Sequence, residues 1–146
     1  MTYLLDINVL IALSDPKHVH HEPAHRWFSA VGSTSWATCP LTETGFVRIL
    51  SNPSYRSIAA TPEEAAVRMR ASCAAPGHVF WRDTISIIDP TLFDLSKLHG
   101  HRQIADAYLA GLAFRNGGKL ATFDANIPVA AIIGSTPDLI ELIPAS

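Results

Sequence analysis

Short, continuously apolar runs alternate along the chain with longer stretches of helical periodicity. An apolar run bounded by turn residues is typical of a buried strand, whereas apolar residues three and four positions apart predict a helix with one buried face. The predicted strands span residues 3–5, 34–39, 79–81, 119–123 and 139–143. The predicted helices span residues 7–13, 23–31, 40–51, 61–75, 90–98 and 102–115.

Capping and turn residues set the ends of these helices. Pro16 ends the first helix and Gly32 ends the second. Thr42 is a candidate cap for the helix that begins near Pro40. Thr61 is followed by proline and two glutamates, a combination typical of a helix start.

The order of the elements predicts the fold class. Strands that alternate with helices and are apolar throughout imply a parallel sheet covered on both faces. We therefore expect an α/β fold, a three-layer α/β/α sandwich in a single domain over residues 1–146. In such sheets ligands bind beyond the carboxyl ends of the strands.

Composition narrows the function classes. Hydrophobic residues make up 48% of the 146 residues and charged ones 16%, which excludes a disordered chain. The formal charge of -2 provides no global positive field, so a nucleic-acid partner would have to be bound by local groups. No apolar run approaches the roughly 20 residues that span a bilayer.

The location of the protein is also an expectation from sequence. Asp6 and Asn8 interrupt the first apolar stretch, which argues against a signal peptide. Cys39 and Cys73 lie in apolar surroundings without a metal-ligand spacing, so we interpret them as small core residues of a reducing compartment. We expect a cytoplasmic protein without membrane association.

Four carboxylates lie at positions where the predicted fold could bring them together. Asp6 and Asp124 directly follow predicted strands, and Glu43 begins the helix after the second strand. Asp106 lies in a run where the other residues are apolar, glycine or tyrosine. A carboxylate on such a helix costs several kcal/mol to desolvate unless a cation meets it.

A shared cation would explain all four acids. Converging carboxylates repel one another and raise their pKa values unless positive charge lies between them. Oxygen ligands suit Mg²⁺ or Mn²⁺ better than zinc, and two such ions can support phosphoryl transfer. Separately, three of the acids have an ordinary explanation: Asp6 as a helix cap, Glu43 as a first-turn acid and Asp124 as a turn residue. Asp106 fits such an explanation poorly.

Four segments of the chain form a recognisable pattern: Leu4-Leu5-Asp6-Ile7-Asn8-Val9-Leu10, Thr42-Glu43, Asp106-Ala107-Tyr108-Leu109-Ala110 and Ala121-Thr122-Phe123-Asp124. Together they resemble the PIN-domain nucleases, in particular the VapC toxins of toxin–antitoxin pairs. The resemblance covers nearly the whole chain, with Ile7 as a departure because the family often has a small or hydroxylated residue there.

The resemblance implies a specific activity and specific roles. Asp6, Glu43, Asp106 and Asp124 correspond to the acidic metal-binding and catalytic quartet, supported by Asn8 and Thr122. The implied activity is Mg²⁺- or Mn²⁺-dependent endoribonuclease cleavage by two-metal-ion catalysis. Attack by a metal-bound water would leave a 5′-phosphate and a 3′-hydroxyl. The implied partners are an RNA such as tRNA, a VapB-like antitoxin and a second copy in a homodimer.

Three other functions remain open at this point. His21-Glu22-Pro23-Ala24-His25 spells the HExxH signature of zinc peptidases, but Pro23 predicts that His21 lies outside the regular helix. A phosphoaspartate-forming phosphatase would need a second acid where Asn8 stands. A PIN-like RNA-binding or regulatory module without catalysis is the third. The nearby His18 and His20 have no assigned role.

Basic and aromatic side chains near these positions are further candidates. Lys97, Arg102 and Arg115 flank the region of Asp106 in sequence, and Arg48 follows Glu43 by five residues, so we interpret them as candidate phosphate contacts. The apolar residues Trp27, Phe28, Phe46 and Ile49 could pack in the core, in a dimer or against an antitoxin.

Overall fold

A five-stranded parallel sheet forms the centre of the computed structural model, which describes residues 1–146. β1 is the middle strand, and Leu4 lies opposite Ala37 of one neighbour and Leu120 of the other, all three fully buried. The sheet is confirmed as parallel throughout. Its order is β3-β2-β1-β4-β5, formed by β1 (Tyr3–Leu5), β2 (Trp36–Thr38), β3 (His78–Phe80), β4 (Lys119–Thr122) and β5 (Ile140–Leu142).

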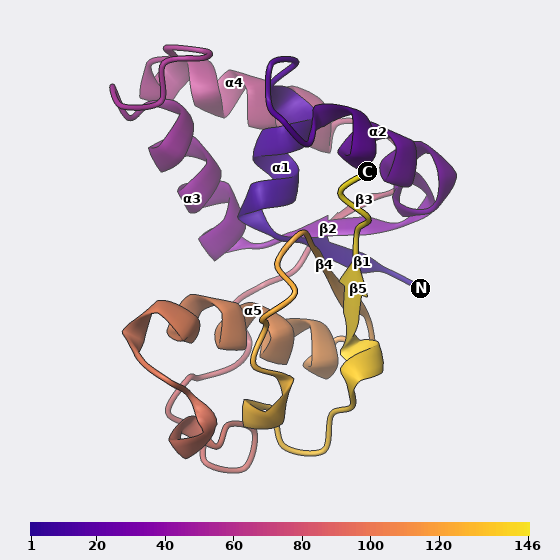
Figure 1. The fold of residues 1–146 in the computed structure, drawn as a ribbon, viewed down its shortest axis with the longest axis vertical. Helices are drawn as coiled ribbons and strands as arrows, with labels where there is room; N and C mark the ends of the chain where they lie inside the picture. Colours follow the sequence, from indigo (N-terminus) through magenta and orange to yellow (C-terminus); the bar gives the residue numbers. More distant parts are fainter.

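Helices cover both faces of this sheet, which confirms the three-layer arrangement. One layer holds four helices and the other holds α5 together with short 3₁₀ turns (Figure 1). Each layer has its own core, around Leu5 and Phe46 on one side and around Leu109 and Leu120 on the other. The helices are α1 (Ile7–Ser14), α2 (His21–Ala30), α3 (Pro40–Leu50), α4 (Pro62–Cys73) and α5 (Ile104–Arg115).

No helix is both long enough and apolar enough to cross a membrane.

The predicted start of α2 and the predicted cap of α3 are wrong for reasons of local chemistry. α2 begins at His21, two residues before Pro23, because the first turn of a helix has no partner for the N–H that proline lacks. α3 is capped at Cys39 and not at Thr42, whose hydroxyl instead accepts a hydrogen bond from the Cys39 backbone N–H at 2.9 Å.

The predicted helix at residues 90–98 is absent. Asp89 and Asp94 each accept hydrogen bonds from backbone N–H groups two residues further on, at Thr91 and Ser96. These side-chain bonds compete with helical hydrogen bonds and favour turns. Only a 3₁₀ turn at Leu95–Lys97 forms there, and a second 3₁₀ turn, His101–Gln103, precedes α5.

Candidate active site

Asp6 and Thr122 meet where two neighbouring strands end. Asp6 directly follows β1 and its backbone N–H donates to the Ala121 carbonyl of β4 at 2.9 Å. The Thr122 hydroxyl donates to Asp6 Oδ2 at 2.7 Å, and the Ile7 backbone N–H donates to Asp6 Oδ1 at 2.7 Å. The Asp6 carboxylate is therefore fixed in one orientation while only 7% of the residue is exposed.

The same hydroxyl organises two further groups. Thr122 Oγ1 accepts a hydrogen bond from the Asp124 backbone N–H at 3.0 Å and another from the Asn8 side-chain amide at 3.3 Å. Asn8 lies in the first turn of α1 and Asp124 follows β4 by two residues. Four residues expected from sequence to belong to one site are thus joined through a single hydroxyl.

Asp106 joins this group from the opposite layer. It lies half-buried in the first turn of α5. Burial, followed by repulsion from Asp6 and Asp124, raises the pKa of Asp106 to about 6. Burial also raises the pKa of Asp6, with a contribution from Asp124, although hydrogen bonds from Thr122 and Ile7 act in the opposite direction.

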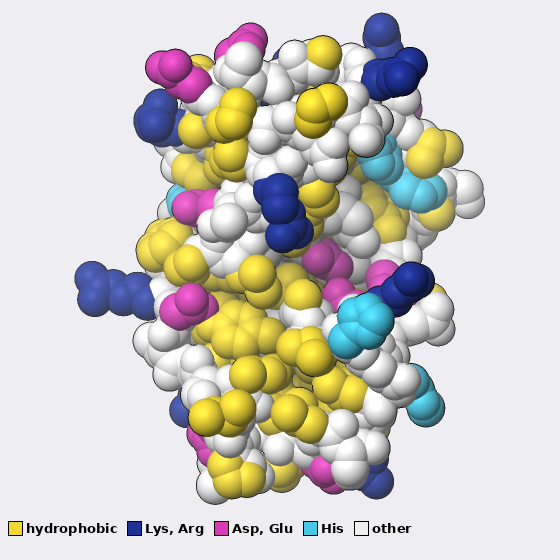
Figure 2. Space-filling model, turned by 90° about the vertical axis from the view of Figure 1, so that its left-hand side faces the viewer, with side chains coloured by type: hydrophobic (Ala, Val, Ile, Leu, Met, Phe, Trp, Pro, Cys, Tyr) yellow, Lys and Arg dark blue, Asp and Glu magenta, His cyan; other side chains and the backbone are white.

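The carboxylates of Asp6, Asp106 and Asp124, called the Asp6 cluster below, suit a hard divalent cation. Acidic side chains gather near the middle of one face of the molecule (Figure 2). The donors are all oxygens, which are the ligands that Mg²⁺ and Mn²⁺ prefer. The Oδ1 atom of Asn8 is buried without a hydrogen-bond partner, and a coordinated water or a cation would satisfy it. The residues present therefore fit the metal that the resemblance implies.

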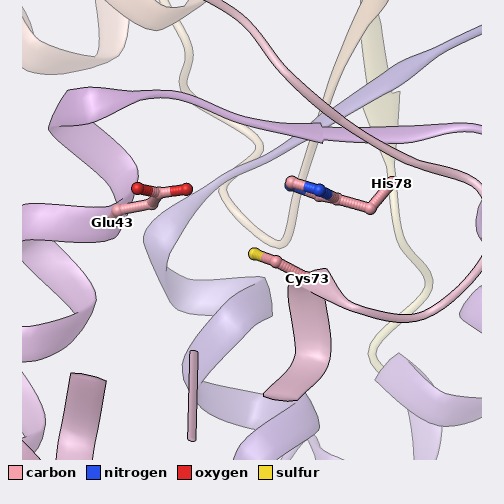
Figure 3. A group of neighbouring side chains, drawn as sticks. All are labelled: Glu43, Cys73 and His78. Atoms are coloured by element: carbon pink, nitrogen blue, oxygen red, sulfur yellow. The ribbon is translucent and has the colours of Figure 1, made fainter. Parts of the chain in front are cut away.

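Glu43 has different neighbours from the other three predicted acids. The Thr38 hydroxyl at the end of β2 donates to Glu43 Oε2 at 2.7 Å. Cys73 and His78 complete a group in which one ligand atom of each residue lies within 4.8 Å of the others (Figure 3). The carboxylate of Glu43 thus belongs to a mixed Glu-Cys-His group in this structure.

Sequence reasoning did not identify Cys73 and His78 as functional candidates. Cys39 is fully buried in the core, as predicted, whereas Cys73 is half-buried at the end of α4 and packs against the edge of the core. The signal available in the sequence was the short separation of the two residues. Cys73 lies near the end of a predicted helix and His78 lies just before a predicted strand. Glu43 lies far from both in sequence, so its part in the group could not be read from spacing.

The HExxH segment is tied to the fold through its histidines. His21 and His25 lie one turn apart on α2, so the prediction that His21 is outside the helix is wrong. His21 Nδ1 lies 2.7 Å from the Ala12 carbonyl oxygen and His25 Nε2 lies 3.0 Å from that of Leu13. These contacts join α2 to the end of α1, and no third ligand approaches the pair, which disfavours a zinc peptidase.

The arginines predicted to contact phosphates differ in their positions relative to the predicted acids. Arg102 lies in the 3₁₀ turn just before α5, one turn ahead of Asp106, and Arg48 lines a cleft of about 560 Å³ together with Glu43. Arg115 is the last residue of α5, about 13 Å along the helix from Asp106 at 1.5 Å per residue. Arg115 therefore lies at the opposite end of α5 from Asp106.

Comparisons with known proteins find similar sequences over most of the chain. The family described as PIN domain matches residues 3–133. Ribonuclease VapC39 of Mycobacterium tuberculosis is 46% identical over 134 residues, covering 92% of this chain and 96% of the relative. Ribonuclease VapC44 of the same organism is 41% identical over 136 residues, covering 93% and 95% of the two chains.

Solved structures give the same fold at low sequence identity. The crystal structure of M. tuberculosis VapC20, titled as a sarcin-ricin loop cleaving toxin, matches with a TM-score of 0.63 at 15% identity over 92% of this chain and 99% of that one. A chain of VapBC2 from Rickettsia felis, bound to a promoter DNA fragment, matches with a TM-score of 0.60 at 12% identity over 99% and 100%.

Proposed function

Because this chain belongs to the PIN-domain family, with relatives named as VapC ribonucleases, we propose that it is the toxin endoribonuclease of a VapBC-type pair. Its substrate is RNA and its cofactor Mg²⁺ or Mn²⁺. The observation that carries the proposal is the convergence of three acids. Asp6 and Asp124 are joined through the Thr122 hydroxyl, and repulsion from both contributes to the raised pKa of the half-buried Asp106. The pKa of Asp6 is raised as well.

Charge explains why this site needs a divalent cation before it can bind RNA. Three carboxylates repel both each other and a phosphodiester, and burial strengthens that repulsion. Asp6, Asp106 and Asp124 would hold the ions. Glu43, the fourth acid of the quartet by family position, has Thr38, Cys73 and His78 as its neighbours in this structure. When bound, Mg²⁺ or Mn²⁺ stabilises charge on the scissile phosphate and makes water a better nucleophile in two-metal hydrolysis.

The residues of the chain provide the positioning. The Thr122 hydroxyl and the Ile7 N–H orient the Asp6 carboxylate, and the Thr122 oxygen holds the backbone of Asp124. Asn8 presents its unpartnered oxygen as an acceptor for a water. Arg102 and Arg48 are the candidates for binding phosphates beside the site, since an arginine fork matches phosphate oxygens.

Partners follow from the same assignment. We expect a VapB-like antitoxin to bind the chain and to suppress its activity, and we expect a homodimer. Co-expression with the cognate antitoxin should restore the growth of cells arrested by the toxin, and light scattering of the purified chain should give the mass of a dimer.

The decisive test is cleavage of an RNA pool by the purified chain. We expect cleavage with Mg²⁺ or Mn²⁺, none with EDTA, and a loss of at least about 100-fold in Asp6→Asn and Asp106→Asn, because each removes a ligand charge. Asp138→Asn, which changes an exposed aspartate on the 3₁₀ turn before β5, is the matched control and should cleave like the wild type.

Two outcomes would reject the assignment. Cleavage that persists in EDTA and in Asp6→Asn would exclude the metal-carboxylate site. Products that end in 2′,3′-cyclic phosphate would show that a ribose hydroxyl attacks, whereas water as the nucleophile leaves a 5′-phosphate and a 3′-hydroxyl.

A further inference from the structure

Glu43, Cys73 and His78 come from three elements and point toward one another (Figure 3). Glu43 lies near the start of α3, Cys73 is the last residue of α4 and His78 is the first of β3. No other group of three or more His, Cys, Asp or Glu side chains brings its ligand atoms within 4.8 Å. The three are half-buried, so the group is shielded but not sealed.

We propose that these three residues form a zinc site, separate from the Asp6 cluster. A thiolate, an imidazole and a carboxylate are the set that borderline cations such as Zn²⁺ accept, whereas Mg²⁺ and Mn²⁺ prefer oxygen. Zinc–ligand distances of about 2.0 to 2.3 Å place tetrahedral ligands roughly 3.3 to 3.8 Å apart. Ligand atoms within 4.8 Å can reach that spacing by small side-chain rotations.

Thr38 holds the ligands in position. It is fully buried at the end of β2, and its Oγ1 lies 2.7 Å from Glu43 Oε2 and 2.7 Å from His78 Nε2. The Cys73 sulfur lies 4.0 Å from the same oxygen. Hydrogen bonds of this kind orient the ligands of metal sites, and their loss lowers metal affinity by about 10- to 100-fold.

The backbone between α4 and β3 fixes the distance between Cys73 and His78. The turn contains Gly77, whose φ of 90° and close approach to the Ser33 carbonyl leave no space for a side chain. The His78 ring packs edge-on against Trp36 with ring centroids 4.6 Å apart. The two ligands are therefore positioned by packed elements and not by a free loop.

A fourth ligand has access from solvent. Glu43 and Cys73 line a cleft of about 300 Å³ that also includes Val47 and Arg70. Three protein ligands with one open position for water is a common zinc arrangement. The positive charge of the Arg70 guanidinium would repel a bound cation. Because Arg70 is exposed, its side chain can extend into solvent away from the site.

The experiment uses the full chain, stripped of metal by a chelator and titrated with Co²⁺. Cobalt bound to a thiolate gives a charge-transfer absorption band, which an all-oxygen site does not. We expect one Co²⁺ per chain with that band, displaced by one Zn²⁺. Cys73→Ser should lose the band, and Cys73→Ser and His78→Gln should each bind Zn²⁺ more than about tenfold more weakly.

Control variants separate the site from its rivals. Asp6→Asn should keep the band, so failure of the ribonuclease proposal leaves this result unaffected. The double variant His21→Gln, His25→Gln tests the other histidine pair and should also keep it. Absence of the band in the wild type, or equal Zn²⁺ affinity in Cys73→Ser, would overturn the proposal. Circular dichroism checks that each variant is folded. If a variant unfolds, the Co²⁺ absorption spectrum of the wild type alone decides the proposal.

Discussion

The hydroxyl of Thr122 makes three hydrogen bonds, to Asp6, Asn8 and the backbone of Asp124. Thr122→Val keeps the shape of the side chain and removes all three. We expect cleavage and Mn²⁺ affinity to fall about 10- to 100-fold, because the partners of metal ligands have effects of that size. RNA cleavage rates and calorimetric Mn²⁺ titration measure the two quantities.

Thr122→Ser is the matched control because it restores the hydroxyl. It should recover most of the activity, while the far-ultraviolet circular dichroism of both variants stays unchanged. Wild-type activity in Thr122→Val would mean that Asp6 is oriented by other contacts.

Asp15 is a buried acid outside the candidate active site, and only 2% of it is exposed. Burial acts to raise its pKa, but hydrogen bonds from Tyr55, from the Lys17 N–H and from Ser57 outweigh burial and lower the pKa below its ordinary value. A group with a lowered folded pKa stabilises the fold above its unfolded pKa, and this stabilisation is lost as pH falls through the folded value.

Asp15→Asn should therefore lower the free energy of unfolding at pH 7 by about 2 kcal/mol, the range for hydrogen bonds to a charged group. The difference between variant and wild type should shrink below about pH 4, near the unfolded pKa of aspartate. Urea unfolding at several pH values measures it. Asp138→Asn, which changes an exposed aspartate on the 3₁₀ turn before β5, is the control, and a pH-independent difference for Asp15→Asn would contradict the titration argument.

At the scale of elements, the turn between α4 and β3 depends on Gly77. A side chain there would meet the Ser33 carbonyl oxygen at 2.3 Å, in a left-handed conformation of φ 90°. Gly117, with φ 70°, has the same conformational demand but nothing within 4 Å. The pair separates the cost of the conformation from the cost of the clash.

Gly117→Ala should destabilise the fold by about 1 to 2 kcal/mol, the cost of a left-handed residue with a Cβ. Gly77→Ala should cost about 1 to 3 kcal/mol more, because a backbone atom cannot yield as a flexible side chain does. Chemical unfolding measures both, and equal losses would show that the turn relaxes away from Ser33.

The elements that the sequence predicted well are those in which periodicity and capping agree. Thr61 caps α4 through reciprocal hydrogen bonds with Glu64, as its spacing predicts. The segment 90–98 was mispredicted because periodicity cannot show that Asp89 and Asp94 bind nearby backbone groups. Local side-chain hydrogen bonds compete with the helix there.

The candidate site likewise contains residues whose positions the sequence could predict and one whose surroundings it could not. Asp6 and Asp124 were predictable because strand ends place them at one edge of a parallel sheet. Asp106 was predictable because an acid on an apolar helix needs a positive partner. The orientation of Glu43 was not, since Thr38, Cys73 and His78 surround it only after α4 and β3 have packed against β2.

For the whole molecule, the Asp6 cluster couples metal binding to stability. Its acids are far apart in sequence: Asp6 follows β1, Asp124 follows β4, and Asp106 lies in α5 in the layer beside the sheet. The folded pKa of Asp106 is about 6, above its ordinary value of 3.8, so folding favours the protonated form. In the metal-free protein, the contribution of Asp106 to stability therefore falls as pH rises from about 4 to about 6 and stays lower above that.

Asp106→Asn removes the charge, so it should abolish the loss of stability at high pH. It should also abolish the stabilisation by bound metal. At pH 8 without metal, the variant should melt above the wild type, and the difference should vanish near pH 4.

Mn²⁺ at a hundred times its Kd should stabilise the wild type by about 2.7 kcal/mol, or about 5 to 10 °C for a domain of this size. It should leave Asp106→Asn nearly unchanged, while Asp138→Asn responds like the wild type. Scanning calorimetry measures these melting temperatures. If the metal-free variant melts below the wild type at pH 8, the Asp106 carboxylate stabilises the fold through an attractive contact. Repulsion within the Asp6 cluster would then no longer explain why the cluster needs a cation.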